Sequence, residues 1–330
     1  MNPLLTIDNL QTHFFTSNGV VKAVDGVSLS IPAGGTLGIV GESGSGKSVT
    51  ALSILRLVSE PGRIVGGRIL FQRGKETVDL LSLPQDKLRD VRGGRIAMVF
   101  QEPMTSLNPV FTIGNQIEEA VALHQKGLSR SDRKAKVIES LSLVRVPDPD
   151  RVAASYPHEL SGGMRQRAMI AMALSCRPEL LIADEPTTAL DVTIQAQVLA
   201  LLNELREKLR MALILITHDL GIIAETVDSV AVMYAGKVVE TGPTKDLFAA
   251  PRHPYTRALL KALPTLKTEG RLQTIPGTVP DLADLPRGCS YQDRCEKVQD
   301  RCRREDPKLE SASGGGGREA RCFFPYNEGA

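Results

Sequence analysis

The segment Gly41-Glu42-Ser43-Gly44-Ser45-Gly46-Lys47-Ser48 fits the phosphate-loop pattern G-x-x-x-x-G-K-[ST]. Glycines let such a loop turn tightly, so that several backbone N–H groups and the positive end of the next helix can hold a polyphosphate. Lys47 can reach the β- and γ-phosphates, and the Ser48 hydroxyl can ligate Mg²⁺. An apolar strand at 36–40 and a helix from Val49 to Val58 are predicted on either side. This strand–loop–helix context is what the pattern requires.

Two carboxylates follow an apolar run at 180–183, which is predicted to be a buried strand. Asp184 can hold Mg²⁺, directly or through water, opposite Ser48. Glu185 can polarise a water molecule for attack on the γ-phosphate. An exposed turn could also carry such a pair, but the apolar run and the upstream phosphate loop favour the metal and catalytic roles.

An amide and an imidazole follow two further predicted core strands. Gln101 ends the apolar run 96–100, and His218 follows the run 212–216. Ligands of α/β folds bind at the carboxyl ends of the strands, so we expect both side chains at the edge that holds Lys47. His218 could then donate a hydrogen bond to the γ-phosphate, and Gln101 could contact Mg²⁺ or the attacking water.

A second predicted anion site lies at the start of a helix, in the stretch LSGGM at 160–164. Ser161, Gly162 and Gly163 expose backbone N–H groups at the helix N-terminus. One phosphate site is already supplied by the loop at 41–48. A second γ-phosphate site therefore suggests that ATP is sandwiched between two such chains.

The remaining pattern predicts an α/β fold with a mostly parallel core sheet. An early antiparallel sheet is expected from strands near 4–10, 27–31, 66–71 and 77–81, with a turn-rich stretch at 13–19. Residues 102–178 have helical spacing and read as an inserted helical subdomain, interrupted at 147–150. A helix at 192–209 and a β-hairpin around 234–236 follow, and prolines interrupt any long element after Gly242.

Composition narrows the function classes. The 330 residues are 42% hydrophobic and 24% charged, as in ordinary globular proteins, and the net charge of +2 gives no general case for nucleic acid binding. No apolar run approaches the roughly 18–20 residues that span a bilayer. The N-terminal residues lack the form of a signal peptide, so a cytosolic location is expected.

The cysteines divide into one isolated residue and a group near the C-terminus. Cys176 lies in an apolar helical stretch and reads as a small core residue. The group has no tight C-x₂-C pair of the kind typical of structural zinc, and a cytosolic location argues against stable disulfides. These cysteines could ligate an iron–sulfur cluster, bind a zinc ion or remain free thiols. A glycine-rich loop at 311–317 precedes the last cysteine of the group. The group comprises Cys289, Cys295, Cys302 and Cys322.

Taken together, residues 1–240 resemble an ATP-binding cassette (ABC) transporter ATPase subunit. The pieces that carry the resemblance occur in the family's order: GESGSGKS (41–48), Gln101, LSGGM (160–164), LLIADEP (180–186), TALD (188–191) and THD (217–219). The implied fold is a P-loop NTPase (RecA-like) nucleotide-binding domain with an N-terminal antiparallel β subdomain and an inserted helical subdomain at 102–178. Residues 241–330 would be a C-terminal extension.

The resemblance also implies roles for single residues. Lys47 and Ser48 would bind phosphate and Mg²⁺, Asp184 would be a further Mg²⁺ partner, Glu185 the catalytic base and His218 the switch histidine. Gln101, also part of the resemblance, keeps the role inferred above, a contact with Mg²⁺ or the attacking water. The nucleotide-binding set expected in this chain is Phe14 or Phe15 against adenine, Gly41, Ser43, Gly44, Ser45, Gly46, Lys47, Ser48, Val49, Gln101, Asp184, Glu185 and His218.

Other residues are expected to serve a nucleotide held by an opposing subunit. Ser161, Gly162 and Gly163 would contact its γ-phosphate, and Asp191 would communicate across the dimer. The general family has Gln as the fifth signature residue, where this chain has Met164. LSGGMRQR is similar to the form found in peptide importer ATPases, so the site is not read as decayed.

The chain most resembles the dipeptide/oligopeptide importer ATPases of the DppD/OppD type, in the peptide/nickel group. QEPMTSLNP (101–109), RHPYTRALL (252–260) and the cysteine-bearing tail carry this closer resemblance. It implies a [4Fe–4S] cluster at the four grouped cysteines. It also implies a second, related ATPase, two membrane permeases and an external peptide-binding protein, assembled at the inner face of the cell membrane.

Several functions stay open at this point. The transported solute could be a dipeptide, a longer peptide, glutathione or a nickel chelate, because the ATPase never needs to touch it. A soluble ABC ATPase acting on nucleic acid or ribosomes would show tandem ATPase domains, a coiled coil or a basic arm, and none is visible. A small-molecule kinase would leave LSGGM and His218 unexplained.

Overall fold

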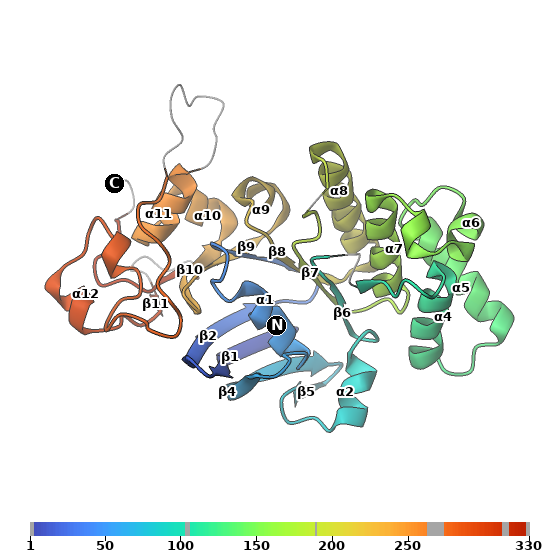
Figure 1. The fold of residues 1–330 in the computed structure, drawn as a ribbon, viewed down its shortest axis with the longest axis horizontal. Coiled ribbons are helices and arrows are strands. Elements are labelled where there is room, and N and C mark those ends of the chain that lie inside the picture. Colours follow the sequence, from blue (N-terminus) through green and yellow to red (C-terminus); the bar gives the residue numbers. More distant parts are fainter. Residues whose placement is uncertain (1–2, 103–105, 189, 263–273, 312–316, 328–330) are drawn as a thin grey trace. The chain divides into compact units, whose positions relative to one another are not determined.

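The computed structural model describes residues 3–102, 106–188, 190–262, 274–311 and 317–327. The chain forms two compact units, the first made of residues 1–32, 36–82 and 215–330 and the second of residues 33–35 and 83–214. Figure 1 labels most of the helices and strands of both units.

The first unit contains a four-stranded antiparallel sheet in the order β2-β1-β4-β5. Its strands are β1 (Leu5–Thr16), β2 (Gly19–Ile31), β4 (Gly62–Arg73) and β5 (Glu76–Asp79). The expected N-terminal antiparallel sheet is therefore confirmed. The turn-rich stretch predicted at 13–19 was wrong in extent, because β1 continues through Thr16. Phe14 and Phe15 stay in the strand and pair with valines of β2, as aromatic and β-branched residues favour.

The second sheet of the first unit has the order β11-β12-β10-β9-β3. Its strands are β3 (Thr36–Val40), β9 (Ser229–Tyr234), β10 (Lys237–Pro243), β11 (Glu310–Ser311) and β12 (Glu319–Ala320). β3 is buried along its whole length and runs parallel to β9, which explains its continuous apolar sequence. β9 and β10 form the predicted hairpin.

Short helices accompany this sheet: α1 (Lys47–Ile54), α9 (Leu220–Thr226), α10 (Thr244–Ala249), α11 (Pro254–Lys261) and α12 (Asp300–Arg304). The helix predicted from Val49 to Val58 both begins and ends earlier. It stops at Ile54 because Arg56 has a φ of 51°, which a right-handed helix does not allow.

In the second unit, β6 (Ile96–Val99) runs parallel to the fully buried β7 (Leu180–Asp184). Its helices are α2 (Gln85–Val91), α4 (Ile113–His124), α5 (Arg130–Leu143), α6 (Pro149–Ala154), α7 (Gly162–Leu174) and α8 (Val192–Leu209). β8 (Ala212–Ile216) begins in this unit and ends in the first. Side-chain caps at Thr112, Ser129, Asp148 and Ser161 begin four of these helices. The predicted interruption at 147–150 is thus also a helix start.

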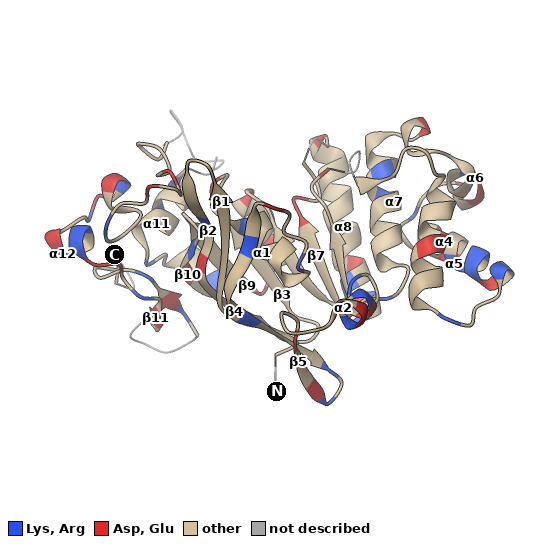
Figure 2. Cartoon of the chain, turned by 60° about the horizontal axis from the view of Figure 1, so that its bottom comes forward, with Lys and Arg blue, Asp and Glu red and all other residues tan. Residues whose placement is uncertain are grey.

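The C-terminal extension is anchored on β10 by a buried carboxylate. Glu240 accepts the backbone N–H groups of Arg252 and His253 at 2.9 and 2.8 Å and faces the guanidinium of Arg318. Most of the predicted glycine-rich loop, residues 312–316, lies outside the described residues. Charged side chains of both signs occur along α5 and α12, with basic residues in excess on each (Figure 2). Across the described chain, no helix combines the length and hydropathy needed to cross a membrane.

Candidate nucleotide-binding site

The glycine-rich loop lies between the buried strand β3 and helix α1, as its sequence pattern requires. Gly41 and Gly46 have φ values of 152° and 99°. A Cβ at Gly41 would lie 2.2 Å from the carbonyl oxygen of Met233, and one at Gly46 would lie 2.2 Å from that of Ala23. Only glycine fits at these two positions, so the neighbouring strands fix the tight course of the loop.

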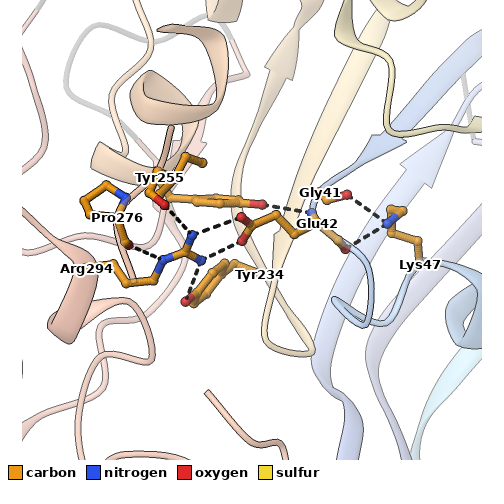
Figure 3. Close-up of polar contacts among 8 residues, drawn as sticks. Gly41, Glu42, Lys47, Tyr234, Tyr255, Pro276 and Arg294 are labelled. Carbon is orange, nitrogen blue, oxygen red and sulfur yellow. Dashed lines mark hydrogen bonds and ion pairs between the residues drawn. The ribbon is translucent and has the colours of Figure 1, made fainter. Parts of the chain in front are cut away.

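Two polar side chains in the loop are buried. The Nζ of Lys47, a residue 6% exposed, donates to the carbonyl oxygens of Gly41 at 2.8 Å and Glu42 at 3.0 Å (Figure 3). Ser45 is 1% exposed, and its Oγ has no hydrogen-bond partner among the described residues. A buried hydroxyl without a partner is costly unless a ligand completes it, so this loop fits a bound anion.

The two candidate adenine-stacking residues differ in exposure. The ring of Phe14 lies over the backbone of Gly62, since a Cβ there would be 2.7 Å from its Cε1. Phe15 is 46% exposed. His218 is also exposed, just beyond β8, and the next residue, Asp219, caps α9 by accepting the N–H of Gly221 at 2.8 Å.

In the second unit, two side chains hold Glu185 at the end of β7. Gln101 Nε2 donates to Glu185 Oε2 at 2.9 Å, and Thr188 Oγ1 donates to the same oxygen at 2.8 Å. Glu185 has a φ of 45°, a conformation that costs a non-glycine residue about 1–3 kcal/mol and is typical of functional positions. Asp184, immediately before it, is 4% exposed. The sequence predicted no individual role for Thr188, which was named only as the first residue of the TALD stretch.

The predicted signature residues lie at the N-terminus of α7. Ser161 is exposed and caps the helix by accepting the N–H of Met164 at 3.4 Å. Gly163 packs closely on α8, because a Cβ there would lie 3.1 Å from Cγ2 of Ile194. Asp191 caps α8 by accepting the N–H of Ile194 at 2.9 Å. The second unit thus brings the signature helix against the start of α8.

The four grouped cysteines share one region of the C-terminal extension. Cys289 N–H donates to the Cys302 carbonyl at 2.8 Å. Burial is the largest of the effects that raise the pKa of Cys289 to about 12. The N–H of Tyr291 acts against it, and the nearby sulfurs of Cys295, Cys322 and Cys302 act with it. Burial likewise raises the pKa of Cys322 to about 11, against the N–H of Phe324, which donates to its sulfur at 3.4 Å.

These backbone N–H groups resemble the donors that stabilise cluster-ligating thiolates, whose reduction potential depends on such bonds. However, no group of three or more His, Cys, Asp or Glu side chains in the described ranges is placed so that it could hold a metal ion. Cys176 lies in the second unit, and burial raises the pKa of its thiol too. It lies beyond the C-terminus of α7 (Gly162–Leu174) and is only half-buried, so its prediction as a helical core residue was wrong.

Sequence reasoning missed the contacts that the C-terminal extension makes with the loop. Arg294 forms an ion pair with Glu42, the second residue of the loop, and the Tyr255 hydroxyl accepts the N–H of Glu42. Arg294 stands directly before Cys295, but no spacing rule links it to a residue 252 positions away.

Comparison with known proteins places these features in a family. The family described as "ABC transporter" matches residues 24–188, and the one described as "Oligopeptide/dipeptide transporter, C-terminal region" matches residues 239–302. The dipeptide transport ATP-binding protein DppD of Escherichia coli (strain K12) is 50% identical over 326 residues, covering 98% of each chain. DppD of Haemophilus influenzae is 49% identical, covering 98% of this chain and 96% of that protein.

Solved structures with the same fold include two ABC cassettes. The ATP-binding cassette MJ0796, in a dimeric post-hydrolysis state bound to ADP and Pi, matches with a TM-score of 0.64 and 26% identity over 73% of this chain and 98% of its own. CbiO1 from Clostridium perfringens, part of the transporter complex cbiONQ, matches with a TM-score of 0.62 and 27% identity over 76% of this chain and 92% of its own.

Proposed function

Because the chain belongs to the ATP-binding proteins of ABC transporters, in their dipeptide and oligopeptide group, we propose that it hydrolyses ATP to power peptide import. The observation that carries this proposal is the match to DppD along nearly the whole length, at 50% identity over 98% of both chains. The match extends into the C-terminal extension, where residues 239–302 match the family of oligopeptide and dipeptide transporter C-terminal regions. That region favours a peptide over glutathione or a nickel chelate as solute.

In this proposal the loop at 41–48 holds the phosphates of ATP. The closely packed Gly41 and Gly46 and the unpartnered Oγ of Ser45 support an anion there. Lys47 would leave the two loop carbonyls that now accept its ammonium and turn to the phosphates. Phe15 is the better candidate for the adenine ring because more of its side chain is exposed.

Hydrolysis needs a positioned water, and Glu185 is the proposed base. The hydrogen bonds from Gln101 and Thr188 orient its carboxylate, which favours a directed proton transfer. The oxygens of Ser48, Gln101 and Asp184 suit Mg²⁺, which would neutralise charge on the phosphates. His218 would donate to the γ-phosphate.

The signature residues are proposed to act on a neighbouring ATPase. The exposed Ser161, with Gly162 and Gly163, would contact a γ-phosphate held by the opposing subunit, and Asp191 would lie at the same junction. The partner would be a second, related ATPase. Two membrane permeases and an external binding protein would complete the complex at the inner face of the cell membrane.

A [4Fe–4S] cluster at the four cysteines is part of the same proposal. The grouping of their sulfurs and the N–H donors of Tyr291 and Phe324 support it. When bound, such a cluster would supply electron-transfer capacity or a structural cross-link.

The test uses the whole complex, purified in detergent through a tag on this chain and reconstituted in liposomes. ATP hydrolysis and uptake of a labelled dipeptide are measured with the binding protein outside, and the matched control is the complex with Glu185→Gln. ATP-dependent uptake lost in the control supports the proposal. Uptake of a nickel chelate or glutathione with no uptake of peptide would assign another solute to the same motor.

A further inference from the structure

The C-terminal extension contacts the phosphate loop at Glu42. Arg294 Nη1 donates to Glu42 Oε2 at 2.6 Å, and its Nη2 donates to Oε1 at 3.0 Å (Figure 3). This is the bidentate geometry in which an arginine–carboxylate pair is strongest. The Arg294 side chain is only 5% exposed, so water screens the pair weakly.

The backbone of Glu42 also forms two hydrogen bonds, one with the extension and one within the loop. Its N–H donates to the Tyr255 hydroxyl at 2.9 Å. Its carbonyl oxygen accepts a hydrogen bond from Lys47 Nζ at 3.0 Å, and the same Nζ donates to the carbonyl oxygen of Gly41. The side chain, N–H and carbonyl of one loop residue therefore link the extension to the lysine that is expected to bind phosphate.

Arg294 is itself fixed by the fold of the extension. Its Nε donates to the Pro276 carbonyl at 2.9 Å, and its guanidinium lies 5.8 Å from the ring centre of Tyr234. Tyr234, Tyr255 and Tyr291 pack against one another with centroids 4.6–5.3 Å apart. A buried aromatic cluster of this kind holds its members in one geometry. Arg294 therefore reaches Glu42 from a rigid support.

The support is continuous with the cysteine region. Arg294 ends a short 3-10 helix at Gln292–Arg294, whose first residue donates its N–H to the Cys289 carbonyl at 3.1 Å. Cys295 follows directly and donates its N–H to the Gln292 carbonyl at 3.4 Å. The segment between two of the grouped cysteines thus carries the arginine that reaches the phosphate loop.

We propose that Arg294 is a positioning residue for the phosphate loop, through which the C-terminal extension sets the affinity of this chain for ATP. The ion pair with Glu42 and the Tyr255 contact hold the start of the loop in the course that receives phosphate. Without them, Glu42 and its carbonyl would be free to shift, and Lys47 with it. The inference rests on the proposed assignment of residues 41–48 as the nucleotide site.

The test compares variants of the purified complex by the dissociation constant for ATP, by KM and by kcat. Arg294→Ala is expected to weaken ATP binding about tenfold or more, the effect of losing a hydrogen-bonded charge, and to leave kcat at saturating ATP less affected. Arg294→Lys, which keeps the charge and loses the two-pronged geometry, is expected to fall between. Arg303→Ala is the matched control: it removes an exposed arginine nearby whose ion pair with Asp293 is long, at 3.9 Å.

A double-mutant cycle separates positioning from general damage. If Arg294 acts through Glu42, Arg294→Ala should have little further effect on ATP affinity in a Glu42→Ala background. Full additivity of the two substitutions would overturn the proposal. Tyr255→Phe, which removes one hydroxyl, gives a gentler second variant should Arg294→Ala fail to fold, and a several-fold loss of ATP affinity with unchanged kcat is expected.

Lys47→Ala tests the assignment of the nucleotide site separately from the role of Arg294. ATP binding by Lys47→Ala equal to that of the unaltered chain would mean that the nucleotide site itself is misassigned. Loss of binding in Lys47→Ala, with Arg294→Ala and Tyr255→Phe both binding ATP as well as Arg303→Ala does, would leave the site in place and reject the role of Arg294.

Discussion

Gln101 and Glu185 are 84 positions apart in the sequence, yet Gln101 Nε2 donates a 2.9 Å hydrogen bond to Glu185 Oε2. The bond joins the residues that follow β6 and β7, two strands that pair in parallel. It orients the carboxylate that is proposed to activate water, together with the hydroxyl of Thr188. The carboxyl ends of neighbouring parallel strands thus supply both the base and its support.

Glu185→Gln is expected to keep ATP binding and to lower the turnover of the assembled complex by at least roughly 10²–10⁴-fold, the range typical of general-base removal. The amide keeps the shape of the side chain and can still accept from Gln101 and Thr188. ATP hydrolysis and nucleotide binding are measured on the same preparation. Near-normal hydrolysis would rule Glu185 out as the base.

Gly46→Ala is expected to destabilise the chain and to abolish nucleotide binding. Its φ of 99° is unfavourable for alanine, and the new Cβ would lie 2.2 Å from the Ala23 carbonyl oxygen. Gly44→Ala is the matched control, because its φ is 75° but no heavy atom lies within 4 Å of the added Cβ. Only the backbone strain of about 1–2 kcal/mol applies there. An equal decrease in the free energy of unfolding of the two variants, measured by urea denaturation, would contradict this account.

The cysteine region should bind iron if it holds a cubane cluster. Anaerobically purified protein is then expected to be brown, with about four irons per chain. Replacing any one of Cys289, Cys295, Cys302 or Cys322 by Ser should lower the iron content, whereas Cys176→Ser should leave it unchanged. Metal analysis that finds zinc with neither iron nor sulfide would reject the cluster.

The raised thiol pKa values predict how the metal-free chain responds to pH. Cys289, with a pKa of about 12, and Cys322, with a pKa of about 11, remain protonated at pH 8, so iodoacetamide should label them more slowly in the native chain than in urea. Unfolded thiols ionise near pH 9, below the folded values. The unfolded state therefore loses protons first, and native stability should fall as pH rises from about 9 towards 12. Equal labelling rates in native and unfolded chains would contradict the burial of these thiols.

Much of the fold was predictable because it rests on local patterns. The apolar runs of β3, β7 and β8 are buried at every residue, and the helix at 192–209 was predicted with the bounds of α8. The error at 13–19 arose because Ser17 and Asn18 mark a turn whose flanking residues remain in strands. The early end of α1 depends on the backbone angle of Arg56, which its residue type does not reveal.

The site was predictable only where a spacing rule exists. The residues of the phosphate loop and the carboxylates after β7 follow such rules, whereas the ion pair between Arg294 and Glu42 does not. That contact depends on how the C-terminal extension packs around Tyr234 and Tyr291, and long-range packing of this kind leaves no periodic trace in a single sequence.

Ser161→Arg tests whether the signature helix serves a neighbouring chain. Ser161 is exposed at the N-terminus of α7, so an arginine there is expected to obstruct the proposed anion site without touching the loop that carries Lys47. ATP binding by the isolated variant should equal that of the unaltered chain, while ATPase activity of the full complex should fall at least about tenfold, because charge-stabilising donors are lost from the composite site. Ser161→Ala removes the cap that receives the Met164 N–H, at a cost of about 1 kcal/mol of stability, together with the hydroxyl proposed to contact the γ-phosphate. Because it adds no bulk, it separates these losses from obstruction of the anion site by the arginine. Full ATPase activity from a strictly monomeric chain, unaltered by Ser161→Arg, would show that ATP is not sandwiched between two subunits.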